Sequence, residues 1–119
     1  MAKIRVFHYP RCSTCKKALK WLGEHGVAVE LIDIVQEPPT KAELRQALKD
    51  SGVSLRKLFN TSGASYREGG FGERLPSMSE AEAIDALEKD GKLIKRPLVV
   101  GKGLALIGFD ETAYRDALS

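Results

Sequence analysis

The chain has 119 residues, two cysteines, a formal net charge of +3 and 43% hydrophobic residues. This length and apolar content suit one domain, residues 1–119, whose core forms without crosslinks. A small positive charge spread along the chain does not favour direct nucleic-acid binding. No apolar stretch approaches the roughly 18 residues that a membrane span needs, and no signal-peptide core follows Met1. We therefore expect a cytoplasmic protein without membrane contact.

The opening third predicts a strand, a helix and a second strand. Residues 3–7 form a short β-rich run, and the apolar residues of 13–25 then repeat at the spacing of one helix face. Gly26 suits the end of this helix, and residues 27–34 have the pattern of a second strand. A helix that connects two neighbouring strands predicts that the strands run parallel.

The middle of the chain predicts helices. Capping boxes at Thr40–Glu43 and Ser79–Glu82 open two of them, which end near Gly52 and Gly91. A shorter helix is expected from Ser54. Residues 60–76, rich in Gly, Ser and charge, are predicted to be a loop over or beside the cysteine-containing turn that follows the first strand.

The last quarter predicts a hairpin and a helix. Leu98–Val100 and Leu104–Ile107 are β runs joined by Gly101-Lys102-Gly103, and Asp110 caps a final helix. The complete order is β-α-β, a helical insertion over about 36–95, then β-β-α. This is the order of the thioredoxin-like α/β fold, with a mixed sheet.

Cys12 and Cys15 stand at the turn from the first strand into the first helix. A helix N-terminus stabilises a thiolate, and Lys16 adds positive charge nearby. Two cysteines three residues apart cannot serve as a disulfide framework, so the pair is redox-active, metal-binding or incidental. Because His8 and His25 are the only histidines and neither has zinc-site spacing, we expect no metal.

Lys95-Arg96-Pro97 precedes the third predicted strand, where a proline is tolerated. In thioredoxin-like folds the corresponding proline lies against the cysteine turn. By this analogy Pro97 supports the site and Arg96 lies beside Cys12, where a guanidinium group can bind an oxyanion and lower the thiol pKa.

Five segments spread over nearly the whole chain form a more specific pattern: His8–Lys16, Glu37–Thr40, Lys57–Thr61, Leu93–Leu98 and Gly108-Phe109. Together they resemble the arsenate reductase (ArsC) family, including its Spx and related branches. The resemblance implies that Cys12 attacks arsenate and that Arg96 helps to bind the anion. It also implies that no cofactor is bound, and that glutathione with glutaredoxin restores the thiol.

The sequence departs from the plasmid-type enzymes of that family at three cationic positions. Their two further anion-binding arginines fall at Asn60 and Gly108, and an arginine is replaced by Lys16. In chromosomal members that resemble this chain, an arginine matching Arg67 follows an Asn-Thr-x-Gly segment. The resemblance therefore predicts an anion site made by Arg96, Arg67 and Lys16.

Cys15 replaces a serine of the plasmid-type enzymes. It is therefore a candidate resolving thiol that forms a disulfide with Cys12, which thioredoxin or glutaredoxin would then reduce. The alternative is that Cys15 only packs on the apolar helix face.

Three further residues are predicted to support the site. His8 either orients the turn or acts as a proton partner of Cys12; the alternative is that it only satisfies a backbone carbonyl. Ser13 and Thr14 supply hydroxyl and backbone donors to an anion at the helix start.

Two functions remain open. The first is a thiol-dependent oxidoreductase that acts on arsenate or another small oxidised oxyanion or thiol substrate. The alternative is an Spx-like redox-sensing regulator that binds RNA polymerase. The Pro38-Pro39 and Asn60–Gly63 segments resemble the enzyme branch more closely.

Overall fold

The computed structural model describes residues 4–101 and 103–118. The chain opens with β1 (Ile4–His8), α1 (Ser13–Glu24) and β2 (Val29–Asp33). β1 and β2 are parallel and pair from Ile4 with Val29 to His8 with Asp33. The predicted β-α-β unit is therefore present.

A mostly helical segment connects β2 to the second half of the sheet. It contains α2 (Lys41–Ser51), η1 (Leu55–Leu58), α3 (Ala64–Glu68), α4 (Phe71–Arg74), η2 (Leu75–Ser77), α5 (Glu80–Lys89) and η3 (Gly91–Leu93). The capping boxes predicted for α2 and α5 are both formed: the side chains of Thr40 and Ser79 accept the backbone N–H three residues later. The chain between β2 and β3 (Leu98–Gly101) is therefore mostly helical.

The prediction of a loop over residues 60–76 is wrong, because α3, α4 and η2 occupy most of it. Tyr66 and Phe71 are buried there and pack against Phe59, with ring centroids 6.3 and 5.6 Å from that of Phe59. Gly70, with φ of +65°, separates α3 from α4. These short helices are stabilised by aromatic packing, which composition does not reveal.

The chain ends with β3 (Leu98–Gly101), β4 (Leu104–Ile107) and α6 (Glu111–Leu118). The sheet order is β2-β1-β3-β4, and β3 is antiparallel to both of its neighbours. Lys102, in the predicted hairpin connection, lies outside the described residues. This mixed sheet and the element order confirm the thioredoxin-like α/β fold.

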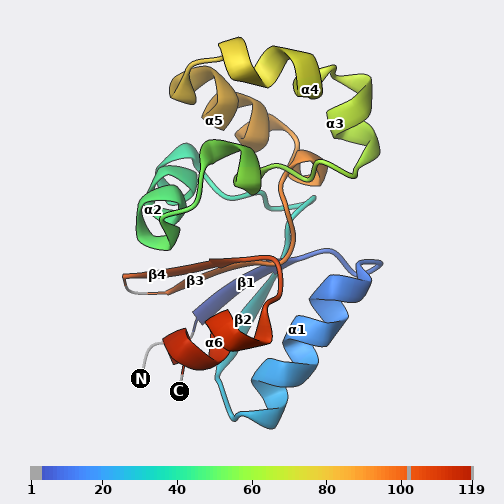
Figure 1. The fold of residues 1–119 in the computed structure, drawn as a ribbon. Helices are drawn as coiled ribbons and strands as arrows, with labels where there is room; N and C mark the ends of the chain where they lie inside the picture. The colour runs from blue at the N-terminus through green and yellow to red at the C-terminus, as the bar shows by residue number, and fades with distance from the viewer. Residues whose placement is uncertain (1–3, 102, 119) are drawn as a thin grey trace.

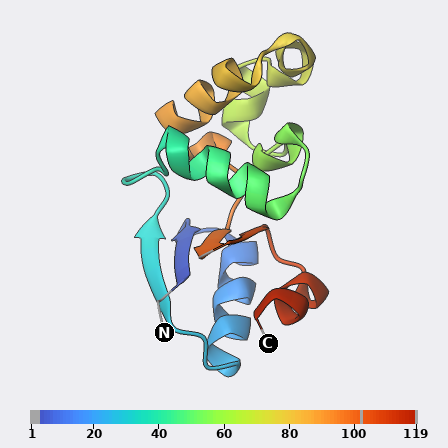
Figure 2. The same cartoon turned by 90° about the vertical axis from the view of Figure 1, so that its left-hand side faces the viewer.

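Helices cover both faces of the sheet, α1 and α6 on one and the helical segment on the other (Figures 1 and 2). An α1-side cluster packs on the first face and comprises Val6, Ala18, Trp21, Leu22, Val99 and Tyr114. A larger insertion-side cluster packs on the second face; among its residues are Phe7, Ile34, Leu44, Phe59, Ile84, Leu87 and Leu98. No helix within the described residues is long and apolar enough to cross a membrane.

Candidate active site

Cys12 occupies the N-cap position of α1, at the end of the turn that follows β1. Its backbone N–H donates to the Tyr9 carbonyl over 3.0 Å, and its Sγ accepts the backbone N–H of Cys15 over 3.3 Å. The first N–H groups of a helix have no partner within the helix and carry partial positive charge. The sulfur therefore takes the place of a capping oxygen, an arrangement that favours its thiolate form.

The surroundings shift the pKa values of the two thiols in opposite directions. Burial raises the pKa of Cys12, but hydrogen bonds from the Cys15 thiol and amide and the nearby Arg96 guanidinium lower it below its ordinary value. Burial and the hydrogen bond to Cys12 raise the pKa of Cys15 to about 12. Of the two thiols, Cys12 is therefore the one whose surroundings favour the thiolate, and Cys15 is the one whose surroundings favour the protonated form.

Arg96 lies beside Cys12 and directly before Pro97, in a cis peptide bond. Its guanidinium carbon is 4.9 Å from the centre of the Tyr9 ring, and its Nη1 donates to the Lys92 carbonyl over 3.4 Å. A cation over an aromatic face is attracted by the negative potential of the ring, which holds it in place. Tyr9, which precedes the cysteine turn, therefore positions Arg96 at the site.

Cys12 and Arg96 open onto a common cavity of about 510 Å³. Thr14, Asn60 and Lys95 also line it. Two cations, a hydroxyl and an amide that line the same cavity as the Cys12 sulfur provide charge and hydrogen-bond donors for a small oxyanion. The remaining lining residues are Ser62, Ile107, Gly108, Phe109 and Asp110.

The other predicted anion-binding residues lie outside this cavity. The Arg67 guanidinium donates to the carbonyl of Ser62 over 2.7 Å, so it contacts a lining residue without lining the cavity itself. Lys16 and Ser13 are exposed, and neither is a lining residue. Their roles in anion binding stay predictions.

Of the predicted supporting residues, Thr14 lies in the cavity wall. His8 is half-buried at the end of β1, and its carbonyl accepts the Ile34 N–H over 2.9 Å. Pro97 is buried at the start of β3. The structure therefore places Thr14 at the site, while the support from Pro97 and a proton-transfer role for His8 stay predictions.

Lys95 is a cavity residue that the sequence analysis did not select. Gly108, where the plasmid-type enzymes carry an arginine, has φ of +75°, and a Cβ there would lie 3.2 Å from Cε of Lys95. An L-residue at position 108 would therefore be strained and would compete with the lysine side chain for space. The sequence feature that could have identified Lys95 is its position directly before Arg96 and Pro97.

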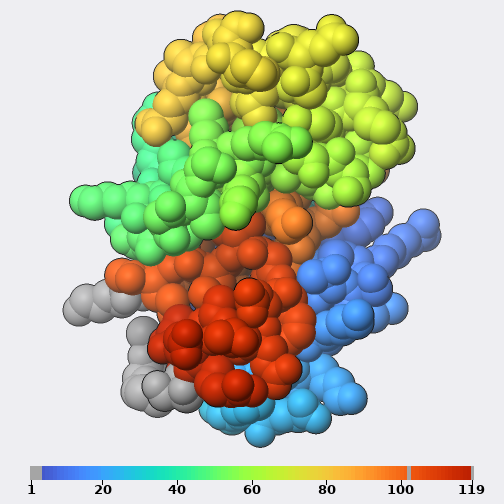
Figure 3. All heavy atoms as spheres, viewed as in Figure 1, coloured from blue at the N-terminus to red at the C-terminus, as the bar shows by residue number. Residues whose placement is uncertain are grey.

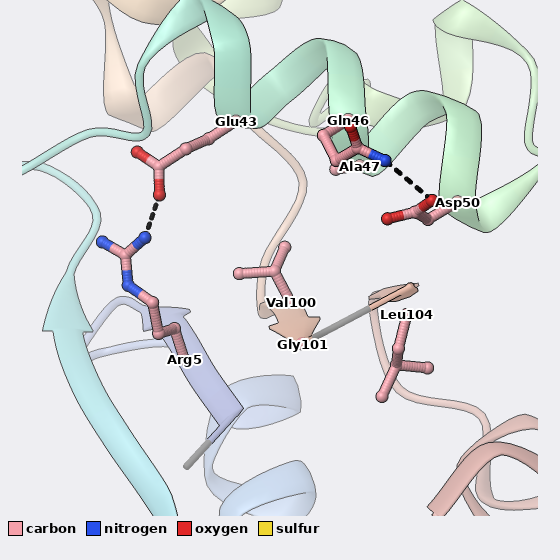
Figure 4. A pocket seen from close by; sticks show the side chains of 8 residues that line it. All are labelled: Arg5, Glu43, Gln46, Ala47, Asp50, Val100, Gly101 and Leu104. Carbon is pink, nitrogen blue, oxygen red and sulfur yellow. Dashed lines mark hydrogen bonds and ion pairs between the residues drawn. The ribbon is translucent and has the colours of Figure 1, made fainter. Parts of the chain in front are cut away.

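Charged side chains also line a second cavity, of about 320 Å³, between α2 and the β3–β4 hairpin (Figure 4). Here Arg5 pairs with Glu43, and the Gln46 amide donates to Asp50 over 2.9 Å. These polar groups satisfy one another, and neither cysteine lines the cavity. Over residues 4–101 and 103–118, no group of three or more His, Cys, Asp or Glu is arranged to hold a metal ion.

The fold and the Cys-x-x-Cys turn at the start of α1 define a thioredoxin-like protein. The sequence model of the ArsC family matches residues 7–117. The chain is 46% identical to the uncharacterized protein YusI of Bacillus subtilis, covering 95% of this chain and 96% of that protein. It is 31% identical to an arsenate reductase of Neisseria meningitidis, covering 91% and 92%. The chain therefore belongs to the ArsC family.

Two more comparisons concern a solved structure and a relative that is named as a regulator. An ArsC family related protein from Bacteroides fragilis has the same fold, with a TM-score of 0.93, 42% identity and coverage of 97% of both chains. The global transcriptional regulator Spx of Streptococcus agalactiae is 28% identical, covering 94% of this chain and 80% of that protein. The relatives thus include both named enzymes and a named regulator.

Proposed function

We propose that this protein is a thiol-dependent oxidoreductase that reduces arsenate or a related small oxidised substrate. Cys12 is the nucleophile, Cys15 is the resolving thiol, and Arg96 binds the anion. The observation that carries the proposal is the Cys12 sulfur, which caps α1, has a lowered pKa and opens onto a cavity lined by Arg96. Relatives named arsenate reductase support the choice of arsenate.

In the first step with arsenate, the Cys12 thiolate attacks arsenic, and one arsenate oxygen leaves as water after taking up protons. Arg96 and Lys95, on the cavity wall, neutralise the charge of the remaining oxygens. Thr14 and Asn60 add hydrogen-bond donors to the same wall. The product of this step is a covalent Cys12–arsenic(V) species.

In the second step, Cys15 loses its proton and attacks the Cys12 sulfur. The sulfur–arsenic bond breaks with its electron pair going to arsenic, so arsenic(V) becomes arsenic(III) and a Cys12–Cys15 disulfide forms. Cys15 is 1% exposed, and its thiol already hydrogen-bonds to Cys12. Thioredoxin, or glutathione with glutaredoxin, supplies the two electrons that restore the thiols.

The test is arsenate-dependent NADPH oxidation, coupled in parallel to a thioredoxin system and to a glutathione–glutaredoxin system. Cys12→Ser should abolish turnover in both systems, because it removes the nucleophile. Cys15→Ser should abolish turnover with thioredoxin only, because glutathione can resolve the Cys12 intermediate from outside. Arg96→Met should raise KM for arsenate.

Arg45→Met is the matched control for Arg96→Met, because Arg45 is exposed on α2 and does not line the cavity. It should leave turnover at the wild-type value. Turnover that survives Cys12→Ser in both systems would contradict the proposal.

The second candidate function is an Spx-like redox switch that binds RNA polymerase. The matching Spx relative and the adjacent Cys12 and Cys15 thiols favour it. In this case an oxidant should form the Cys12–Cys15 disulfide without arsenate turnover, and purified RNA polymerase should bind the oxidised and reduced proteins differently. A pull-down with both forms distinguishes this function from the enzyme.

A further inference from the structure

A third cavity lies within the helical segment, away from both cysteines. It has a volume of about 280 Å³ and is enclosed by residues of η1, α3, α4 and η2. Figure 3 shows the green chain around η1 lying directly beside the yellow-green and yellow chain of α3, α4 and η2. The third cavity shares no lining residue with the cavity at Cys12. A ligand bound here therefore does not touch the thiols.

The buried hydroxyl of Tyr66 has no protein partner. Tyr66 is 8% exposed and lines the third cavity. Within residues 4–101 and 103–118 its hydroxyl forms no hydrogen bond, whereas the buried hydroxyl of Tyr114 donates to the Gly108 carbonyl over 2.6 Å. Polar groups on buried side chains are nearly always hydrogen-bonded. An unpaired hydroxyl on a residue that lines a cavity therefore indicates a place where a ligand can supply the missing partner.

Aromatic packing fixes the position of the Tyr66 ring. Its centroid lies 6.3 Å from that of Phe59 and 6.1 Å from that of Phe71. A Cβ at Gly72 would meet one atom within 4 Å, Cε1 of Tyr66, at 3.8 Å. Because Gly72 has no side chain, this edge of the ring stays open towards the cavity that both residues line. The space beside Tyr66 is therefore already formed in the folded protein.

The remaining lining combines apolar walls with one cation. Leu55, Leu75 and Pro76 contribute apolar surface, and Arg56 is the one ionised lining residue among those described. Arg56 is exposed, and its side chain forms no ion pair and no hydrogen bond within the described chain. In the cavity of Figure 4, by contrast, Arg5 is neutralised by Glu43. An unpaired cation beside apolar walls and a hydroxyl donor favours a ligand with a carboxylate and a hydrocarbon body.

The volume of the cavity limits the size of that hydrocarbon body. An apolar cavity of about 150 Å³ in a protein interior is large enough to bind benzene. The third cavity, with about 280 Å³, therefore has room for a body of about six carbons together with a carboxylate.

We propose that this cavity binds a small monocarboxylate with a hydrocarbon body of about six carbons. Its carboxylate accepts hydrogen bonds from the Arg56 guanidinium and the Tyr66 hydroxyl, and its hydrocarbon part packs on Leu55, Leu75 and Pro76. The binding site is separate from the thiols, so the proposal holds whether or not the protein reduces arsenate.

The experiment is a titration of the ¹⁵N-labelled protein with hexanoate, followed by the NMR signals of the backbone amides. Hexanoate should shift the signals of residues 55–56 and 72–75 in a saturable way and leave those of residues 12–16 unmoved. Acetate carries the charge without the chain, so it should bind more than tenfold more weakly. Shifts that do not saturate, or that lie away from the third cavity, would overturn the proposal.

Two variants test the predicted polar contacts. Arg56→Gln should weaken hexanoate binding roughly two- to fivefold, the size expected from one exposed charge pair, and leave binding of neutral hexan-1-ol unchanged. Tyr66→Phe should weaken hexanoate binding while the urea midpoint stays at or above the wild-type value, because the hydroxyl has no protein partner to lose. A purely structural role of Tyr66 would instead lower the midpoint and leave the affinity unchanged.

Arg45→Gln is the matched control for Arg56→Gln, because it removes the same charge from an exposed position on α2 outside the cavity. Its affinity for hexanoate should equal that of the wild type. Gly72→Leu places a side chain beside the Tyr66 ring and should abolish hexanoate binding. If Arg56→Gln and Arg45→Gln bind hexanoate equally well, the proposed carboxylate contact is wrong and the proposal fails.

Discussion

Replacing Gly91 by alanine adds one methyl group where η3 passes the end of β2. An ideal Cβ at residue 91 would lie 1.9 Å from the Ile34 carbonyl oxygen and 2.7 Å from its carbonyl carbon. Side-chain Cβ atoms essentially never approach other atoms within 3.0 Å. Both contacts are with backbone atoms, so no side-chain rotation relieves them, and the two segments must separate.

Overpacking in a protein interior costs about 1–3 kcal/mol, and a clash with backbone belongs at the upper end. With a urea m-value of about 1–3 kcal/mol/M, a loss of about 3 kcal/mol lowers the unfolding midpoint by roughly 1–3 M. Trp21 is the single tryptophan and is buried, so its fluorescence follows the transition.

Gly23→Ala is the matched control, because a Cβ at residue 23 meets nothing within 4 Å. This residue is exposed in the last turn of α1, so alanine should stabilise the protein by about 0.5 kcal/mol through its helix propensity. Opposite signs for the two variants are expected. A Gly91→Ala protein within about 0.5 kcal/mol of the wild type, the range of a neutral surface change, would refute the argument from close backbone approach.

The thiolate, a buried hydroxyl and a helix cap give three further predictions. Because the pKa of Cys12 is lowered, its alkylation by iodoacetamide should approach full rate at a lower pH than for an ordinary thiol. Arg96→Met should move this profile to higher pH, as followed by peptide mass spectrometry; an unmoved profile would contradict the role of Arg96. Tyr114→Phe removes the 2.6 Å bond from the buried hydroxyl to the Gly108 carbonyl. It should cost about 1–3 kcal/mol in urea unfolding. Thr40→Ala removes the N-cap of α2 and should cost about 1 kcal/mol in the same assay.

Features that depend on neighbouring residues were predictable from the sequence. The capping box at Thr40 is complete within four residues, since its side chain accepts the Glu43 N–H and the Glu43 carboxylate accepts the Thr40 N–H. The same holds for the position of Cys12 at the start of α1. Such contacts are local, so the pattern of residue types is enough to find them.

Features that depend on distant segments were not predictable. α3 and α4 form because Tyr66 and Phe71 pack against Phe59, and the glycines between them hide any helical periodicity. Lys95 reaches the cavity because its segment pairs with Leu58, far away in the sequence. A single sequence carries no direct record of such pairings, so the place of Lys95 in the cavity emerges only from the structure, whereas the place of Arg96 was predicted by analogy with the fold.

The placement of the two apolar clusters on opposite faces of the sheet has a consequence for how this family can diversify. The helix that carries both thiols is anchored in the α1-side cluster, whereas Asn60 and Lys95 arrive on segments anchored in the insertion-side cluster. Substitutions of Asn60 or Lys95 therefore change one wall of the cavity without removing a residue of the α1-side cluster. Proteins that descend from one ancestor can therefore come to prefer different ligands while the surroundings of the sulfur stay the same.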